Sequence, residues 1–131
     1  GGLVGCETAL HMGMQGHDVT VLEMRDDVAV DATADHRRYL IPRLEEHVKI
    51  ACGMRVTKIT KEAVEATDAE DRVHSFPADS VLIAAGLKAR TAEVELLRSP
   101  DYDFVVIGDA KRARNVFAAV REGFDAATFV R

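Results

Sequence analysis

The sequence contains no tryptophan, and phenylalanine and tyrosine together bring the aromatic share to only 5%. Aromatic side chains are the platforms on which single-stranded nucleic acids stack, so their scarcity argues against such a surface. Acidic residues outnumber basic ones, the formal net charge is −5, and no block of Lys and Arg is present to neutralise phosphates. We therefore expect neither a nucleic acid nor an anionic membrane surface as a partner.

Long apolar runs and paired cysteines are missing as well. No stretch approaches the roughly 18 apolar residues that a membrane-spanning helix needs, and no charged and then apolar signal peptide opens the sequence. Its two cysteines, Cys6 and Cys52, lie far apart without CxxC spacing, and its histidines show no metal-ligand spacing. These absences argue against a disulfide scaffold or a metal site, and they favour a cytoplasmic protein with free thiols.

The residues that are present describe a globular domain in which helical and strand-like segments alternate. The 131 residues are 47% hydrophobic and 30% charged, enough for a real core. We expect helices at residues 5–15, where Gly16 ends the helix, at 34–47, where Pro42 would kink or interrupt it, and at 113–130. Strands are expected at 17–23, in three or four short stretches between 48 and 76, at 80–85 and at 104–107.

This alternation predicts an α/β fold with a mainly parallel sheet, into which a small antiparallel hairpin is inserted before residue 80. The runs SVLIAA at 80–85 and FVVI at 104–107 are continuously apolar, as is typical of strands buried in parallel sheets. Ligands of such sheets bind beyond the carboxyl ends of the strands, so residues that follow strands are the candidates for a binding site.

The opening GGLVG has the spacing of the last two glycines in the dinucleotide-binding pattern GxGxxG. Gly2 would let the backbone approach a pyrophosphate, and Gly5 would let the helix pack closely on a strand. The N-terminus of that helix would attract the phosphates, and Glu7 would lie in its first turn. The first glycine of the pattern would precede Gly1, so GGLVG taken alone is better explained as a cloning scar or a flexible lead.

Two acidic residues follow predicted strands. Glu23 closes HDVTVLE, 18 residues after Gly5, where a carboxylate can hold the ribose hydroxyls of NADH and repel the 2′-phosphate of NADPH. Arg25 could accept that phosphate, so the choice between the two stays open. Asp109 follows FVVIG, where it could accept hydrogen bonds from the sugar or ribityl hydroxyls of a ligand. The plainer alternatives are a solvated acid for Glu23 and a helix cap for Asp109.

The chain resembles the carboxyl-terminal part of the NADH:flavin oxidoreductases of the 2,4-dienoyl-CoA reductase type, in the old yellow enzyme superfamily. Their dinucleotide-binding domains are similar to those of the pyridine nucleotide-disulfide oxidoreductases. The resemblance rests on four blocks in order: GGLVGCETALHMGMQGHDVTVLEM, RRYLIPRLEEHVKI, ADSVLIAAGLKAR and DFVVIGDAKRARNVFAAVREGFDAA. It implies a Rossmann-like, doubly wound sheet that lacks its first strand, because that strand would precede Gly1.

The resemblance also implies a domain organisation and a set of cofactor contacts. Residues 1–87 would be an NAD(P)H-binding domain, truncated at its N-terminus, and residues 88–131 the returning segment of an FAD-binding domain. Glu7 would lie near the nicotinamide, Ala85 and Gly86 at the crossover between the domains, Asp109 on the ribityl chain, and Arg114 to Val116 against the flavin ring. The implied cofactor-binding residues are Gly2, Gly5, Glu7, Glu23, Arg25, Ala85, Gly86, Gly108, Asp109, Arg114, Asn115 and Val116.

A larger parent enzyme follows from the same resemblance. A barrel holding FMN and usually an iron–sulfur cluster would lie outside this sequence, as would the adenosine-binding part of the FAD domain. The chain would bind NAD(P)H and part of FAD, with the rest of the parent as its partner, and electrons would pass to a flavin and on to an enoyl or dienoyl substrate. No catalytic residue is expected here, and the isolated chain is expected to be inactive.

Two alternatives stay open. A disulfide-reductase-like flavoprotein shares the layout of two dinucleotide domains, although those enzymes carry a redox cysteine pair and continue into a dimerisation domain. A non-catalytic nucleotide-binding or self-associating module would instead pair its exposed sheet edges with another copy and form a homo-oligomer.

Overall fold

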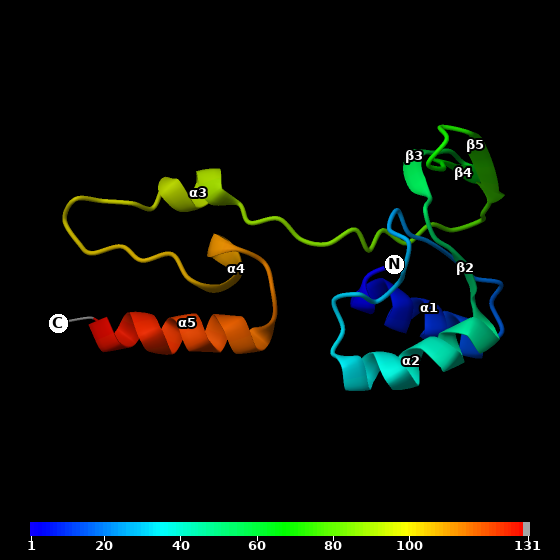
Figure 1. The fold of residues 1–131 in the computed structure, drawn as a ribbon. Coiled ribbons are helices and arrows are strands. Elements are labelled where there is room, and N and C mark those ends of the chain that lie inside the picture. Colours follow the sequence, from blue (N-terminus) through cyan, green and yellow to red (C-terminus); the bar gives the residue numbers. More distant parts are fainter. Residues whose placement is uncertain (130–131) are drawn as a thin grey trace. The chain divides into compact units, whose positions relative to one another are not determined.

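The computed structural model describes residues 1–129. The chain divides into two compact units, Gly1–Ala85 and Gly86–Arg131, named unit 1 and unit 2 below. Unit 1 contains α1, α2 and all the strands, whereas unit 2 contains α3, α4 and α5 (Figure 1). The parallel strand pair with its helices and the separate antiparallel sheet confirm the predicted α/β class.

Unit 1 begins with two helix-then-strand pairs. Helix α1 (Leu3–Met14) leads to β1 (Thr20–Leu22), and α2 (Ala34–His47) leads to β2 (Lys49–Ala51). The two strands pair in parallel, with Val21 opposite Ile50. The long connection from β1 to β2 therefore contains α2, as parallel pairing requires.

Different contacts fix the two ends of α1. Asp31 Oδ1 accepts the Leu3 N–H at 2.8 Å, and the helix begins at Leu3, two residues before its predicted start. At the other end Gly16 has φ +89°, and its N–H donates to the Gly13 carbonyl at 2.9 Å. The predicted C-terminal glycine is confirmed, because only glycine adopts this left-handed conformation without steric cost.

Helix α2 starts at a side-chain cap and runs through a proline. The Thr33 Oγ1 accepts the His36 N–H at 3.3 Å, which satisfies one of the free donors of the first turn. Pro42 lies inside the helix without interrupting it, so the predicted break does not occur. Proline removes one backbone donor, and the buried side chains of Leu40 and Leu44 hold the helix to the core on both sides of it.

The core of unit 1 is small and apolar, and it requires a close approach of the two helices. Its buried members are Cys6 and Ala9 of α1, Val21 of β1, Val28 and Ala29 of the following loop, Leu40 and Leu44 of α2, and Val48. A Cβ at Gly13 would lie 2.6 Å from the His47 carbonyl oxygen, far inside van der Waals contact. Glycine at this position therefore lets α1 approach the end of α2.

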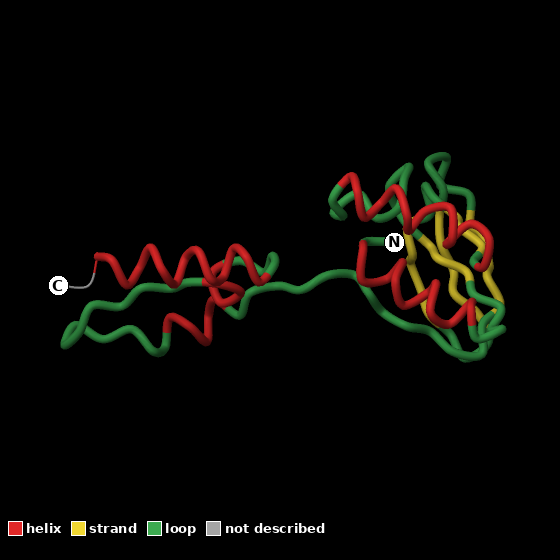
Figure 2. Tube along the Cα trace, turned by 90° about the horizontal axis from the view of Figure 1, so that it is seen from below, coloured by secondary structure: helices red, strands yellow, loops and turns green. Residues whose placement is uncertain are grey.

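The predicted short strands between residues 48 and 76 are confirmed. After β2 come β3 (Arg55–Ile59), β4 (Ala63–Thr67) and β5 (Val73–Pro77), which form an antiparallel sheet in the order β3-β4-β5 (Figure 2, yellow). Asp68 organises the turn between β4 and β5, because its Oδ1 accepts the backbone N–H groups of Glu70 and Arg72 at 3.0 and 2.9 Å.

Unit 2 contains α3 (Thr91–Glu95), α4 (Gly108–Lys111) and α5 (Val116–Phe129). Helix α5 begins three residues later than predicted, because the Asn115 Oδ1 accepts the Ala118 N–H at 2.9 Å and so caps the helix there. The predicted end of this helix at Val130 lies outside the described residues.

Two predicted strands are wrong. Residues 80–85 and 104–107 have no regular secondary structure, and Leu82 and Ile83 are 70% and 78% exposed. A strand is defined by a ladder of hydrogen bonds to a neighbour, and among residues 1–129 neither segment has a partner strand. The apolar runs show that these segments are suited to burial, but not that a strand lies beside them.

Candidate functional site

The carboxylate of Glu23 lies against the glycine turn that precedes α1. Glu23 follows β1 directly, and its Oε2 is 2.9 Å from the amino nitrogen of Gly1. Its Oε1 accepts the backbone N–H of Arg25 at 2.9 Å, and the side chain is only 14% exposed. A Cβ on Gly1 would lie 2.6 Å from the Glu23 Cβ. This approach therefore requires a residue without a side chain.

The environment of Glu23 keeps it ionised. Partial burial of the carboxyl opposes ionisation, but hydrogen bonds to the carboxylate, among them the one from the Arg25 backbone N–H, outweigh it and lower the pKa of Glu23 below its ordinary value. A fixed negative charge thus stands at the carboxyl end of β1. Such a group accepts hydrogen bonds from hydroxyls and repels phosphate.

A second carboxylate, which the sequence patterns did not indicate, meets the same turn. Asp31 accepts the Leu3 N–H, and a Cβ on Gly2 would lie 3.4 Å from its Oδ2. The loop that carries Asp31 is also tied to the turn by the Ala29 N–H, which donates to the Gly1 carbonyl at 2.7 Å. Asp31 complements the positive end of the α1 dipole. It lies 28 residues from Leu3 in sequence, so no local spacing could have predicted the contact.

The other predicted residues of unit 1 lie near the turn with different partners. A Cβ on Gly5 would lie 3.2 Å from the Ala84 Cβ, so the helix passes close to the 80–85 segment although that segment is not a strand. Glu7 was predicted to lie in the first turn of α1, but α1 begins at Leu3, so Glu7 lies beyond that turn. Its Oε1 is 3.2 Å from the Nε2 of His36 on α2. The side chain of Arg25 is exposed.

The predicted crossover falls where the two units divide. Ala85 is the last residue of unit 1, and Gly86 is the first of unit 2. Gly86 has φ +87°, a left-handed conformation that L side chains rarely adopt. A non-glycine residue would strain the chain at this point.

In unit 2 the predicted residues gather around one carboxylate. The Oε2 of Glu122 on α5 accepts the Gly108 N–H at 2.7 Å, and its Oε1 pairs with the guanidinium of Arg114. The Oδ1 of Asp109 accepts the Arg114 backbone N–H at 3.3 Å. The hydrogen bonds from Arg114 and from Gly108 lower the pKa of Glu122 below its ordinary value. The Glu122–Gly123–Phe124 segment was visible in sequence, but its link to Gly108 was not.

Two further predicted residues flank this cluster. Asn115 caps α5 through its side chain, and Val116, the first residue of that helix, is 78% exposed. The cluster thus presents a backbone turn, two opposite charges and an exposed aliphatic side chain within unit 2.

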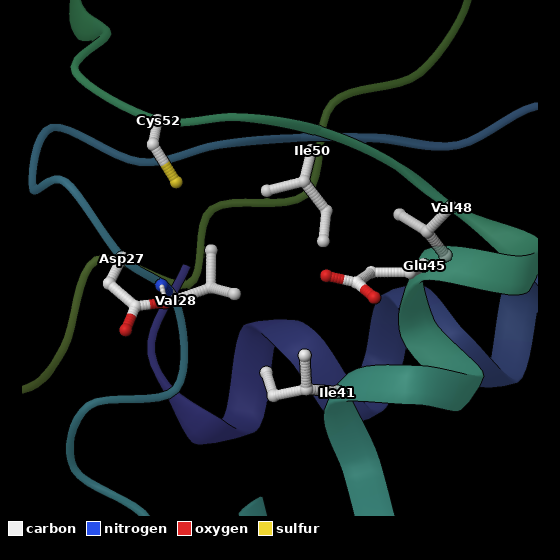
Figure 3. A pocket seen from close by; sticks show the side chains of 7 residues that line it. All are labelled: Asp27, Val28, Ile41, Glu45, Val48, Ile50 and Cys52. Atoms are coloured by element: carbon white, nitrogen blue, oxygen red, sulfur yellow. Dashed lines mark hydrogen bonds between the residues drawn. The ribbon is translucent and has the colours of Figure 1, made fainter.

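A hollow of about 330 Å³ lies elsewhere in unit 1 (Figure 3). Val28, Ile41, Val48 and Ile50 line it together with Asp27, Glu45 and Cys52. None of the predicted site residues contributes to it, so the candidate site is the turn around Glu23. Within residues 1–129 no group of three His, Cys, Asp or Glu side chains could hold a metal ion, and no helix there is long and apolar enough to cross a membrane.

Comparison with known proteins gives a consistent result. A family model described as pyridine nucleotide-disulphide oxidoreductase matches residues 1–119. The chain is 36% identical over 129 residues to a bilirubin reductase of Mediterraneibacter gnavus (strain CC55_001C), a match that covers 97% of this chain and 20% of the relative. It is 33% identical over 129 residues to an NADH oxidase of Thermoanaerobacter brockii, with the same coverage.

A solved structure of 2-naphthoyl-CoA reductase in complex with 2-naphthoyl-CoA superimposes with a TM-score of 0.80 at 25% identity, covering 100% of this chain and 20% of that one. The chain therefore spans about one fifth of the length of the relatives that it matches. These matches confirm the predicted resemblance to reductases of the 2,4-dienoyl-CoA reductase type.

Proposed function

The chain belongs to the pyridine nucleotide-disulphide oxidoreductase family, and from this we propose that it binds the nicotinamide dinucleotide and part of FAD within a flavin-dependent NAD(P)H oxidoreductase. We assign residues 1–87 to the NAD(P)H-binding domain and residues 88–131 to the returning segment of the FAD-binding domain. The division of the chain at Ala85 and Gly86 supports this assignment.

One observation carries the nucleotide part of the proposal, namely the approach of Glu23 to the glycine turn at the start of α1. A dinucleotide fold needs a close backbone turn for the pyrophosphate and an acid at the end of the next strand for the ribose. Here the two lie within 2.9 Å of each other, joined through Gly1. The residues therefore fit the group that the family implies.

Each residue then has a stated role toward the cofactor. Gly2 adds no side chain between the turn and the pyrophosphate, Gly5 keeps α1 close to the chain at Ala84, and Glu23 accepts the ribose hydroxyls. The fixed charge of Glu23 favours NADH, whereas the exposed Arg25 gives NADPH an alternative contact. Glu7 stands toward the nicotinamide end. Bound NAD(P)H would supply a hydride for transfer to flavin.

The remaining assignments concern the enzyme as a whole. Gly108 and Asp109 are assigned to the ribityl chain, and Arg114, Asn115 and Val116 to the flavin ring. The parent enzyme would add FMN and an iron–sulfur cluster outside this chain, and it would reduce an enoyl or dienoyl substrate. The free thiols of buried Cys6 and half-buried Cys52 support a reducing compartment, the cytoplasm.

Calorimetric titration of the chain with NADH and with NADPH tests the proposal. We expect saturable binding, with NADH favoured, and Glu23→Gln should reduce that preference because it removes the charge but keeps an acceptor for the Arg25 N–H. Glu23→Ala should weaken NADH binding by about tenfold, as for the loss of hydrogen bonds to a charged group. Glu62→Ala, at an exposed acid of the same unit, is the matched control. Absence of binding at millimolar NADH would contradict the proposal.

A self-associating module is the second candidate function. The observation that favours it is the exposure of Leu82, Ile83 and Leu87, which are 70%, 78% and 80% exposed. Exposed apolar residues that lie close together along the chain promote contact with another chain. Sedimentation that shows an oligomer dependent on protein concentration, together with no NADH binding, would favour this module over the dinucleotide domain.

A further inference from the structure

Glu122 connects separate parts of the proposed flavin segment. It projects from α5 and contacts both the start of α4 and the loop between the two helices. Its side chain is 20% exposed, against 49% for Asp125, 58% for Glu95 and 65% for Glu93, which also pair with arginine in the described part of unit 2. Glu122 is thus the least exposed of these carboxylates, and it lies on a helix with no buried residue.

The geometry at Gly108 explains why a carboxylate is needed. Gly108 has φ +59°, is buried, and would place a Cβ 3.4 Å from that of Ala119. This left-handed residue turns the chain into α4, and its N–H points to Glu122. A buried N–H without an acceptor would cost about 1–3 kcal/mol. Glu122 satisfies it and thereby holds the turn in the conformation that presents Asp109.

The second oxygen of the same carboxylate holds Arg114. The guanidinium pairs with the Glu122 Oε1, and Lys111 Nζ lies 4.0 Å from that oxygen. Asp109 fixes the other end of Arg114 by accepting its backbone N–H. Gly108, Asp109 and Arg114 are therefore locked to one another through Glu122.

We propose that Glu122 is a positioning residue for flavin, which holds the Gly108–Asp109 turn and the Arg114 guanidinium together without touching the cofactor. The inference rests on the proposed flavin-binding function of residues 88–131. It also refines it. The N–H of Gly108 already has an acceptor, so Gly108 serves through its backbone conformation, and Asp109 and Arg114 supply the groups that can meet a ligand.

Two measurements on the whole chain test this role. Hydrogen exchange of the Gly108 amide, followed by NMR, reports the turn without any cofactor, and FAD titration followed by the amide shifts of Asp109 and Arg114 reports binding. Glu122→Ala should speed exchange at Gly108 and weaken FAD binding by roughly tenfold, the size of one hydrogen bond to a charged group. Glu122→Gln should restore much of the protection, because its amide oxygen still accepts the N–H, while leaving Arg114 free.

Asp125→Asn is the matched control, because Asp125 lies on the same helix, pairs with Arg121 at 3.2 Å and does not contact Gly108. Equal exchange at Gly108 in the wild type and Glu122→Ala, or equal acceleration by Asp125→Asn, would overturn the positioning role. Faster exchange with unchanged FAD affinity would overturn the link to flavin and leave the proposed function standing. Absence of FAD binding by the wild type would instead refute the flavin assignment, while exchange still decides whether Glu122 holds the turn.

Discussion

In unit 1 most buried side chains are apolar, and those of two helices, a strand and a loop meet in one core. In unit 2 Gly108 is the only buried residue among 86–129, and Phe117, Val120 and Phe124 of α5 are 76%, 66% and 67% exposed. Ion pairs are prominent among the contacts of unit 2, with Glu122 joined to Arg114 and Glu95 to Arg98.

This difference indicates that different interactions stabilise the two units. Burial of apolar surface is the main stabilising term in folding, whereas an exposed ion pair contributes about 0–1 kcal/mol. Unit 1 therefore has a source of stability of its own. A helix with an apolar face, such as α5 of unit 2, gains stability when that face is buried. We therefore expect unit 2 to unfold before unit 1.

The largest expected effect is in the core of unit 1. Leu44 is fully buried, and Leu44→Ala should lower the free energy of unfolding by about 2–5 kcal/mol, because it leaves a cavity. Urea denaturation followed by circular dichroism measures the change. The same substitution at Leu97 in unit 2, which is 63% exposed, should cost less than about 0.5 kcal/mol. Equal losses at the two sites would remove the distinction between the units.

An identical substitution in one helix of each unit should have opposite signs. Gly13→Ala forces a Cβ to within 2.6 Å of the His47 backbone oxygen, so we expect it to destabilise unit 1 by about 1–3 kcal/mol. Gly123→Ala meets only the Ile107 Cδ1 at 3.8 Å, and alanine should stabilise α5 by about 0.5–1 kcal/mol through its helix propensity. Hydrogen exchange along α1 and α5 reads both changes, and destabilisation of α5 by Gly123→Ala would show that its environment is tighter than the structure indicates.

The smallest effect concerns the charged turn of unit 1. Asp68 Oδ2 lies 2.8 Å from His74 Nε2 and 2.7 Å from Arg72 Nε, and these partners hold the pKa of Asp68 well below its ordinary value. A lowered folded pKa stabilises the folded state above the unfolded pKa of about 3.9, and this contribution is lost as the pH falls below it.

Asp68→Asn should therefore reduce the thermal midpoint modestly at pH 7 and flatten its decline in acid. Thermal unfolding between about pH 7 and 2 measures both quantities, with Asp79→Asn, at an exposed carboxylate of unit 1, as the control. Parallel pH profiles for wild type and Asp68→Asn would show that the turn contributes nothing through ionisation.

Much of the fold of unit 1 was predictable because its signals are local. Apolar periodicity and a terminal glycine predict α1, and β-branched residues predict β1 with Glu23 at its end, since these patterns act over a few residues. The spacing of Gly2, Gly5 and Glu23 likewise predicts that a turn and an acid belong to one site. Their roles in binding remain predictions.

Only the tertiary structure decided the contacts between residues that lie far apart in the sequence. Whether residues 80–85 and 104–107 become strands depends on a neighbouring ladder, which apolar composition cannot supply. Asp31 meets Leu3 across 28 residues and Glu122 meets Gly108 across 14, so each pairing exists only once the chain has folded. The sequence by itself determined the helices and short strands of unit 1 and the acid at the end of β1, because propensity and periodicity are local. The fold decided which buried or terminal N–H groups receive a carboxylate, because that requires distant segments to meet.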